Sequence, residues 1–154
     1  VISDAYVDTI ELAAPVCDIG NVAVPTEILQ KTDRLTAEEK YIMRRHTEVG
    51  ERILQGIEEE DEGNDFIQMS KEIVKYHHES WDGTGYPAGI AGEQIPLSAQ
   101  IVNIVTSYCA LTEERSYRNA FSKEEAFAIM KKEAQTKFNP QLYEVLFLIR
   151  RQLV

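Results

Sequence analysis

The sequence predicts one all-α domain, a helical bundle that spans residues 1–154. The hydrophobic pattern is helical throughout the chain, and capping signals precede several of the amphipathic segments. At 154 residues, with a hydrophobic fraction of 44% and a charged fraction of 27%, the chain matches one globular domain with a sizeable core. No repeat, linker or low-complexity segment divides it.

Three helices are predicted in the N-terminal part of the chain. The first covers residues 5–16, where apolar side chains recur at helical spacing. A loop rich in Gly and Pro signals follows, and Pro25 opens a short helix. A capping box at Thr36-Ala-Glu-Glu39 starts the third helix, which continues to about Leu54 and carries His46 within its apolar stripe.

Four further helices follow, separated by one long loop. An amphipathic helix is expected over residues 64–79. The glycines and the proline of residues 83–92 exclude regular structure there, and a loop of this length in a compact domain is usually functional. Leu97–Thr112 is largely apolar and predicts a buried helix. The last two helices begin at the capping box Ser122-Lys-Glu-Glu125 and at Asn139-Pro140, an N-cap followed by Pro.

The net charge and the cysteine content indicate which kinds of partner and which cell compartment to expect. The net charge of −10 argues against DNA or other broad nucleic-acid binding, because phosphate backbones require clustered positive charge. No apolar run approaches the roughly 20 residues that span a bilayer, so no membrane segment is expected. Cys17 and Cys109 are too few for a disulfide framework and fit a reducing cytoplasm.

The most informative stretch is residues 77–87, which read His-His-Glu-Ser-Trp-Asp-Gly-Thr-Gly-Tyr-Pro. Imidazole is the commonest metal ligand in proteins, and a Gly-rich turn lets the backbone approach a ligand closely. Neighbours on a helix diverge by about 100°, so His77 and His78 can share an ion only near a helix end. The pattern indicates a metal site beside an anion-binding loop.

The block at residues 77–87 resembles the signature of the HD-GYP family, whose active members are metal-dependent phosphodiesterases of the bacterial messenger cyclic di-GMP. The resemblance implies an HD-domain-like helical bundle in cyclic di-GMP signalling. The family often carries this domain behind a receiver or sensor domain, as in response regulators. Because the chain starts without Met, we expect it to lack an N-terminal helix or such an attached domain.

The resemblance extends beyond residues 77–87. Further blocks that match in the same order are Asp18-Ile-Gly20, Arg45-His46-Thr-Glu-Val-Gly50, Gly92-Glu-Gln-Ile-Pro96, Ala110-Leu-Thr112, Arg115-Ser-Tyr-Arg118 and Phe138-Asn-Pro140.

The resemblance implies a metal cage of which four ligands survive. Its His-Asp pair falls on Cys17-Asp18, so Cys17 stands where the family has His. The next family ligand matches His46, and the adjacent imidazoles match His77 and His78. Metal ligands are therefore expected at Asp18, His46, His77 and His78, with Cys17 as a further candidate. The structural alternatives are that His46 is a satisfied core histidine and that Cys17 is a small buried filler.

Two more positions depart from the family. The later Asp ligand falls on Thr106, and the Lys that follows the His-Asp pair is Asn21. A clustered centre holds cations about 4 Å apart and needs bridging carboxylates to offset their repulsion, which a hydroxyl does not supply. A thiol at Cys17 makes the site softer and favours zinc. We therefore expect one divalent metal (Zn, Fe or Mn) or none.

A second group of residues is predicted to contact an anionic ligand. Arg115 and Arg118 resemble the family segment that faces the phosphates, and guanidinium groups match phosphate oxygens in bidentate fashion. Tyr86 can stack on a guanine, and Gly83 and Gly85 allow close backbone approach. The alternatives are surface salt bridges for the arginines, packing for the tyrosine and a simple turn for the glycines.

The leading hypothesis is a degenerate HD-GYP domain that is catalytically impaired and works as a regulatory binding module. Its partner is cyclic di-GMP, or a signalling protein that contacts the GYP loop. The alternative is an active cyclic di-GMP phosphodiesterase with a reduced metal centre, in which Asp18 is catalytic and holds the metal with the three histidines. A third hypothesis is a scaffold whose apolar helices pair in a homodimer.

Overall fold

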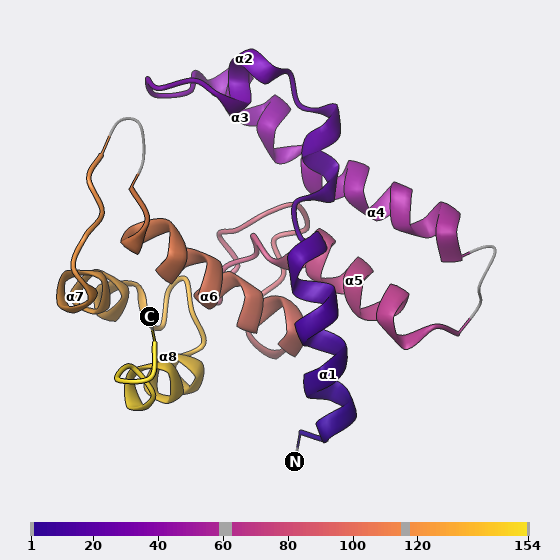
Figure 1. The fold of residues 1–154 in the computed structure, drawn as a ribbon. Coiled ribbons are helices and arrows are strands. Elements are labelled where there is room, and N and C mark those ends of the chain that lie inside the picture. Colours follow the sequence, from indigo (N-terminus) through magenta and orange to yellow (C-terminus); the bar gives the residue numbers. More distant parts are fainter. Residues whose placement is uncertain (1, 59–62, 115–117, 154) are drawn as a thin grey trace.

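The structure is a computed structural model that describes residues 2–58, 63–114 and 118–153. Helices dominate these ranges and no strand occurs in them, which confirms the all-α prediction (Figure 1). The helices are α1 (Asp4–Ala13), α2 (Thr26–Leu29), α3 (Ala37–Arg44), α4 (His46–Glu58), α5 (Asp65–Tyr76), α6 (Leu97–Thr112), α7 (Lys123–Glu133) and α8 (Pro140–Leu148), with short 3₁₀ helices η1 (Ala14–Val16), η2 (Ile19–Ala23) and η3 (Gly92–Gln94).

The predicted helix starts are confirmed where the sequence carries a cap. Thr36 Oγ1 accepts a hydrogen bond from Glu39 N (3.2 Å), and Glu39 Oε2 accepts one from Thr36 N (2.7 Å). Ser122 and Glu125 form the same reciprocal pair at the start of α7. Asn139 caps α8 through its side-chain oxygen. Each such cap stabilises a helix by about 1 kcal/mol, so these boundaries are fixed locally.

The single helix predicted from Thr36 to Leu54 is wrong, because the chain turns at Arg45 and divides it into α3 and α4. Side chains beyond the turn take up carbonyls of the last turn of α3. His46 Nδ1 lies 2.6 Å from Met43 O, and Thr47 Oγ1 donates to Arg44 O (3.0 Å). The helix predicted over residues 64–79 likewise ends earlier, at Tyr76, which leaves both adjacent histidines beyond its last turn.

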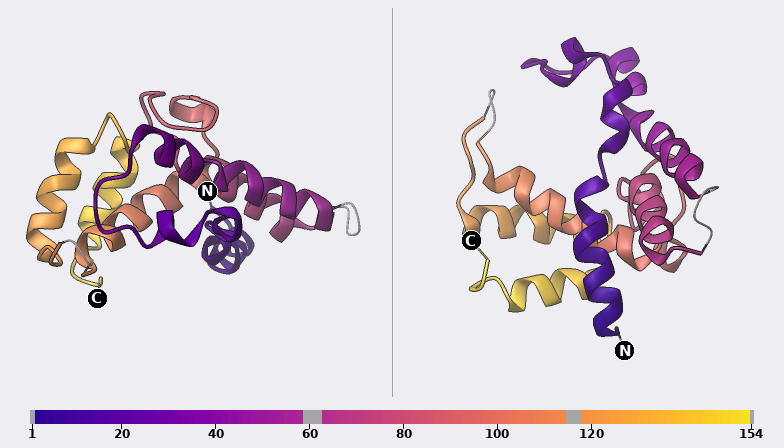
Figure 2. Two further views of the ribbon diagram at one scale, coloured as in Figure 1. Left: turned by 90° about the horizontal axis from the view of Figure 1, so that it is seen from above. Right: turned by 45° about the vertical axis from the view of Figure 1, so that its right-hand side comes forward.

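Helix α6 runs through the middle of the fold, with α1, α4 and α5 on one side and α7 and α8 on the other (Figures 1 and 2). Neither α6 nor any other helix of the described ranges is long and apolar enough to cross a membrane. One apolar cluster joins the end of α1 to α5 and α6 through Ala13, Ile73 and Val102. The other fills the space between α6, α7 and α8 and contains Ile104, Tyr108, Ala126, Phe127, Met130, Phe138, Tyr143 and Leu146.

Two glycines let neighbouring elements lie directly against α4: Gly20 in η2 approaches its start, and Gly50 within α4 faces α5. A Cβ atom on Gly20 would lie 1.8 Å from His46 O, and one on Gly50 would lie 2.4 Å from Val74 Cγ1. Real Cβ atoms do not approach other atoms this closely, so both positions require glycine while the elements stay in place. The close approach brings Asp18, at the start of η2, next to the first residue of α4.

Candidate metal centre

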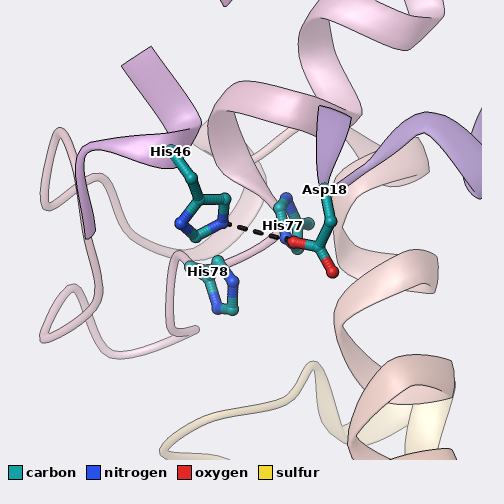
Figure 3. Close-up of side chains that lie close together, drawn as sticks. All are labelled: Asp18, His46, His77 and His78. Atoms are coloured by element: carbon teal, nitrogen blue, oxygen red, sulfur yellow. Dashed lines mark ion pairs between the residues drawn. The ribbon is translucent and has the colours of Figure 1, made fainter. Parts of the chain in front are cut away.

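Four predicted ligands converge at one place in the fold. Asp18 precedes η2, His46 begins α4, and His77 and His78 follow the last turn of α5. One ligand atom from each lies within 4.8 Å of those of the other three (Figure 3). The position of His77 and His78 beyond the helix lets adjacent residues face one point, which their 100° separation inside a helix would prevent.

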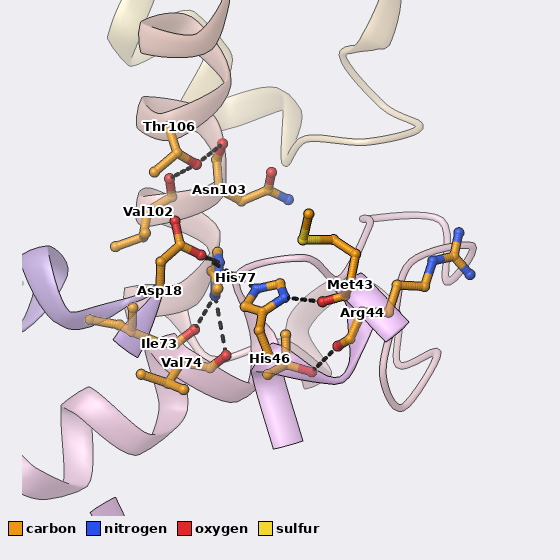
Figure 4. Close-up of polar contacts among 11 residues, drawn as sticks. Asp18, Met43, Arg44, His46, Ile73, Val74, His77, Val102, Asn103 and Thr106 are labelled. Carbon is orange, nitrogen blue, oxygen red and sulfur yellow. Dashed lines mark hydrogen bonds and ion pairs between the residues drawn. The ribbon is translucent and has the colours of Figure 1, made fainter. Parts of the chain in front are cut away.

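Backbone carbonyls fix the tautomers of two of the imidazoles. His46 Nδ1 lies 2.6 Å from Met43 O, and His77 Nδ1 lies 2.8 Å from Ile73 O (Figure 4). Because a carbonyl oxygen only accepts, each Nδ1 carries a proton, and in the neutral imidazole the Nε2 atom then keeps its lone pair. Both Nε2 atoms face Asp18 Oδ1, at 3.4 Å from His46 and 3.5 Å from His77. This is the arrangement in which outer carbonyls orient histidine ligands toward a metal.

One ligand atom of the cluster lacks a hydrogen-bond partner. His46 Nε2 is buried, and no hydrogen bond reaches it within the part of the chain that the structure describes. A buried polar atom left unpaired costs about 1–3 kcal/mol. A cation at the cluster would accept the lone pair of this atom, and three imidazole nitrogens with one carboxylate suit zinc, iron or manganese. The residues present therefore fit one divalent transition metal.

The electrostatics of the cluster also favour a cation. Burial lowers the pKa of His46, and burial with the neighbouring His77 and His46 lowers the pKa of His78 to about 3. The His77 imidazole lowers the pKa of Asp18, although burial opposes the shift. Metal ligands must be deprotonated to bind, so near neutral pH His46, His78 and Asp18 are in their binding states without prior loss of a proton.

Cys17 lies beside the cluster but is not part of it among the described residues. Its side chain is buried with Ala13, Ile73 and Val102 in the apolar cluster below η2. Burial and the adjacent Asp18 raise the pKa of the Cys17 thiol to about 11. Because a bound metal would itself deprotonate a coordinating thiol, it is the packing of Cys17, rather than this pKa, that separates it from the cluster. The structure thus places Cys17 as a small apolar filler.

Thr106 and Asn21, the other two positions that differ from the HD-GYP family, add no charged group to the cluster. Thr106 Oγ1 donates to Val102 O at 2.7 Å, so its proton points back along α6 (Figure 4). A threonine hydroxyl carries no charge, unlike the carboxylate that the resemblance implies there. Asn21 has a buried Oδ1 without a hydrogen-bond partner among the described residues, and its side chain brings no positive charge.

Tyr86 packs against one residue of the cluster, His78. Its ring stacks on that of His78, with 4.8 Å between centroids and an interplanar angle of 13°. The guanidinium of Arg44 lies 4.8 Å from the centroid of the Tyr86 ring. Burial raises the pKa of Tyr86 to about 12, so its hydroxyl stays protonated. The contact with His78 is a packing role; stacking on a guanine stays a prediction.

The predicted glycines shape the loop that follows His78. Gly83 has a φ of +82°, which glycine adopts without strain. A Cβ atom on Gly85 would lie 2.3 Å from Ser80 N, because the loop folds back on its own start. Tyr86 N donates to His78 O (3.1 Å) at the same crossing. The loop itself requires both glycines, and a contact with phosphate stays a prediction for each.

Sequence reasoning missed Glu79 as the anchor of this loop. Its side chain is 1% exposed, and its Oε1 accepts hydrogen bonds from Ala88 N (2.6 Å) and Gly89 N (3.1 Å). A buried carboxylate that accepts backbone N–H groups stabilises the segment that carries them. The available signal was a glutamate directly after two histidines and before a glycine-rich loop.

A cleft of about 440 Å³ opens in front of the cluster. Its lining includes Asp18 and His78 of the cluster together with Thr106, Arg118 and Lys137. A larger cavity of about 720 Å³ lies between α7 and α8, and none of the predicted site residues lines it. The cleft beside Asp18 and His78 is therefore the place where a ligand would meet the cluster.

The structure describes one of the two arginines that are predicted to contact phosphate. Arg115 lies outside the described residues. Arg118 lines the cleft, but its guanidinium donates to Ala110 O (2.6 Å) and Leu111 O (3.3 Å) at the end of α6 and lies 4.4 Å from the centroid of the Phe121 ring. These contacts give Arg118 a capping role, and its contact with phosphate stays a prediction.

Comparison with known proteins agrees with the fold and the cluster. The model of the HD domain family matches residues 2–142. The chain belongs to the HD domain family. A cyclic di-GMP phosphodiesterase of Vibrio cholerae is 36% identical over 153 residues, which make up 99% of this chain and 31% of that protein. A cyclic di-GMP phosphodiesterase response regulator of Xanthomonas campestris is 38% identical over 152 residues, 99% of this chain and 39% of that protein.

A third relative acts on a different cyclic dinucleotide. It is the 3′3′-cGAMP-specific phosphodiesterase 2 of Vibrio cholerae, 36% identical over 145 residues, which are 94% of this chain and 27% of that protein. This HD domain chain thus spans between 27% and 39% of the length of the three relatives. The resemblance to the HD-GYP family is confirmed.

Proposed function

We propose that this HD domain binds cyclic di-GMP with the help of one divalent metal and acts as a regulatory module that hydrolyses the messenger slowly or not at all. The observation that carries the proposal is the cluster of Asp18, His46, His77 and His78, whose ligand atoms lie within 4.8 Å of one another. The relatives that are cyclic di-GMP phosphodiesterases support the class of ligand.

The size of the cluster suits one ion. Ligand atoms on opposite sides of a transition metal lie about 4.2 Å apart, given metal–ligand distances of about 2.1 Å. A second ion about 4 Å away needs its own donors and a carboxylate that bridges the two. Among the described residues, the cluster contains the single carboxylate of Asp18. Cys17 packs in the apolar cluster with Ala13, Ile73 and Val102, and Thr106 offers a neutral hydroxyl that donates to its own helix.

Each side chain of the cluster contributes to binding in a different way. Asp18 supplies the negative charge, and His46 and His77 are held in the binding tautomer by Met43 O and Ile73 O. A divalent metal held by these side chains supplies a Lewis acid that attracts a phosphodiester oxygen. Tyr86 keeps the His78 ring in place by stacking on it.

The same residues are not well suited to hydrolyse a phosphodiester bond. A general base works best when its pKa lies near the working pH, and the pKa of Asp18 is lowered instead. The Lys that the resemblance implies beside the attacked phosphate is Asn21, which carries no charge. Binding without efficient turnover is the function that this set of side chains supports.

The test combines metal analysis with binding and turnover on one preparation. We expect about one transition metal per chain, calorimetric binding of cyclic di-GMP, and product formation at background level by chromatography. His77→Ala should lose the metal and the binding, whereas Cys109→Ser, outside the cluster, should keep both. Two or more ions per chain, with turnover that His77→Ala abolishes, would support the active phosphodiesterase instead. Metal-loaded protein that fails to bind cyclic di-GMP would contradict the proposal.

A further inference from the structure

The cleft in front of the cluster must offset the charge of an anionic ligand within a chain of net charge −10. Its lining contains two carboxylates, Asp18 and Glu133, and two cations, Arg118 and Lys137. A phosphate group in a cleft of this composition needs a cation whose hydrogen-bond donors are not already engaged. The two cations differ in this respect.

Arg118 is engaged by the protein. Its Nη2 donates to Ala110 O at 2.6 Å, and its Nη1 donates to Leu111 O and to Asn119 O, both at 3.3 Å. The carbonyls at the end of α6 have no partner within the helix, so Arg118 satisfies them and stabilises this end against its dipole. Leu111 O also accepts from Phe121 N (2.9 Å), but turning the guanidinium toward a ligand would remove the short hydrogen bond that Arg118 donates to Ala110 O.

Lys137 is held in place by its backbone, and its ammonium group makes only two weak contacts, an ion pair with Glu133 and a position 5.2 Å from the centroid of the Phe138 ring. Its backbone N donates to Glu133 O (2.8 Å), and its carbonyl accepts from Trp81 N (3.0 Å) in the loop after His78. The Nζ atom lies 3.9 Å from Glu133 Oε2, which is beyond hydrogen-bond distance. Within the described ranges no other carboxylate pairs with this ammonium group, and 40% of the side chain is exposed.

We infer that Lys137 is the cation of this cleft that binds a phosphate oxygen of the ligand. The inference rests on the proposed binding of cyclic di-GMP and adds a residue to that site. Lys137 lies in the turn between α7 and α8, far along the chain from position 21, where the resemblance implies a Lys and this chain has Asn21. The positive charge missing from η2 is thus supplied from the opposite half of the sequence.

A lysine in this role has a specific consequence for recognition. Its ammonium acts as a point charge on a flexible stem, whereas an arginine fork fixes the orientation of a phosphate. Because the side chain is partly exposed, its attraction to phosphate is screened by salt. Affinity should therefore fall with ionic strength, and the fall should be smaller once Lys137 is neutralised.

The test measures cyclic di-GMP affinity of the metal-loaded chain by calorimetry at two salt concentrations. Lys137→Gln should weaken binding about 10-fold at low salt, the effect of one charge-assisted hydrogen bond. Lys137→Arg should retain most of the affinity. Asn21→Lys in the Lys137→Gln background should restore part of it, because it returns a cation to η2. Lys131→Gln, a matched loss of charge on α7 outside this cleft, should change nothing.

Thermal unfolding and metal content of each variant separate a binding effect from a loss of fold. If wild-type protein binds cyclic di-GMP and Lys137→Gln binds it equally well, the inference is wrong and the proposed function stands. If a folded, metal-loaded wild type does not bind the messenger, both are wrong. Should Lys137→Gln fail to fold, Lys137→Ala takes its place: weaker binding with a smaller salt dependence than in Lys137→Arg supports the role of the charge, and equal affinity and salt dependence in the two variants contradict it.

Discussion

Asp18 Oδ1 lies 3.4 Å from Nε2 of His46, and Gly20, two residues further on, packs its Cα against the carbonyl of the same histidine. The contact that builds the candidate metal centre is therefore also a close approach of two backbones. A change that pushes η2 away from α4 should weaken folding and metal binding together.

Gly20→Ala should reduce both the free energy of unfolding and zinc affinity. The added Cβ would lie 1.8 Å from His46 O, and this backbone atom cannot move aside cheaply. Overpacking of this kind costs about 1–3 kcal/mol. Urea unfolding and zinc titration measure the two effects. Gly56→Ala is the matched control, since its Cβ meets nothing within 4 Å in α4 and should stabilise the protein by about 0.5–1 kcal/mol.

Glu79→Gln should loosen the loop after His78. The carboxylate is buried and accepts hydrogen bonds from Ala88 N at Oε1 and from Gly89 N at both oxygens. An amide group keeps only one oxygen for them and carries no negative charge. We expect a loss of about 1–3 kcal/mol in unfolding free energy and faster hydrogen exchange of these two amides. Glu93→Gln, at an exposed position near the end of the same loop, is the control. Unchanged exchange at Ala88 and Gly89 would show that Glu79 does not anchor the loop.

The metal-free protein should lose stability as the pH falls below about 6.5. The folded pKa of His78 is about 3, whereas an unfolded histidine titrates near 6.5. Between these values the unfolded chain binds the extra proton, so the unfolding free energy decreases toward acid by at most about 1.4 kcal/mol per pH unit from this residue. Urea unfolding at several pH values measures the slope. His78→Gln should flatten it, and an unchanged slope in that variant would contradict the assignment.

Local signals in the sequence were sufficient for several helix starts and for the four side chains that converge in the cluster. The caps at Thr36, Ser122 and Asn139 work within three residues of themselves, so they are legible without the fold. These four candidates were recognisable because His77 and His78 stand next to a glycine-rich loop that resembles a known signature.

Features that depend on distant contacts were not predictable in the same way. The turn at Arg45 was missed although its contacts are local: the His46 and Thr47 side chains contact carbonyls three residues earlier, and the apolar stripe continues across the break. The capping contact of Arg118 needs the end of α6 beside it, and the place of Lys137 in the cleft needs the loop after His78. Such pairings join segments far apart in sequence, where no spacing rule applies.

Replacing the missing carboxylate should show whether its loss limits the site. Thr106 lines the cleft with Asp18 and His78, so Thr106→Asp introduces an anionic oxygen donor on that face of α6. In combination with Cys17→His, which restores the His-Asp pair, we expect the metal content to rise from about one ion to about two per chain and turnover of cyclic di-GMP to appear.

The matched control for this gain is Thr106→Asn with Cys17→His, because asparagine has the shape of aspartate without its charge. This variant should stay near one ion per chain and show no turnover. The Cys17→His change should itself destabilise the fold by about 1–3 kcal/mol, since the thiol is packed against Ile73 and Val102. A folded Thr106→Asp, Cys17→His protein that still holds one ion would mean that the spacing of the cluster, rather than its charge, limits the centre to a single metal.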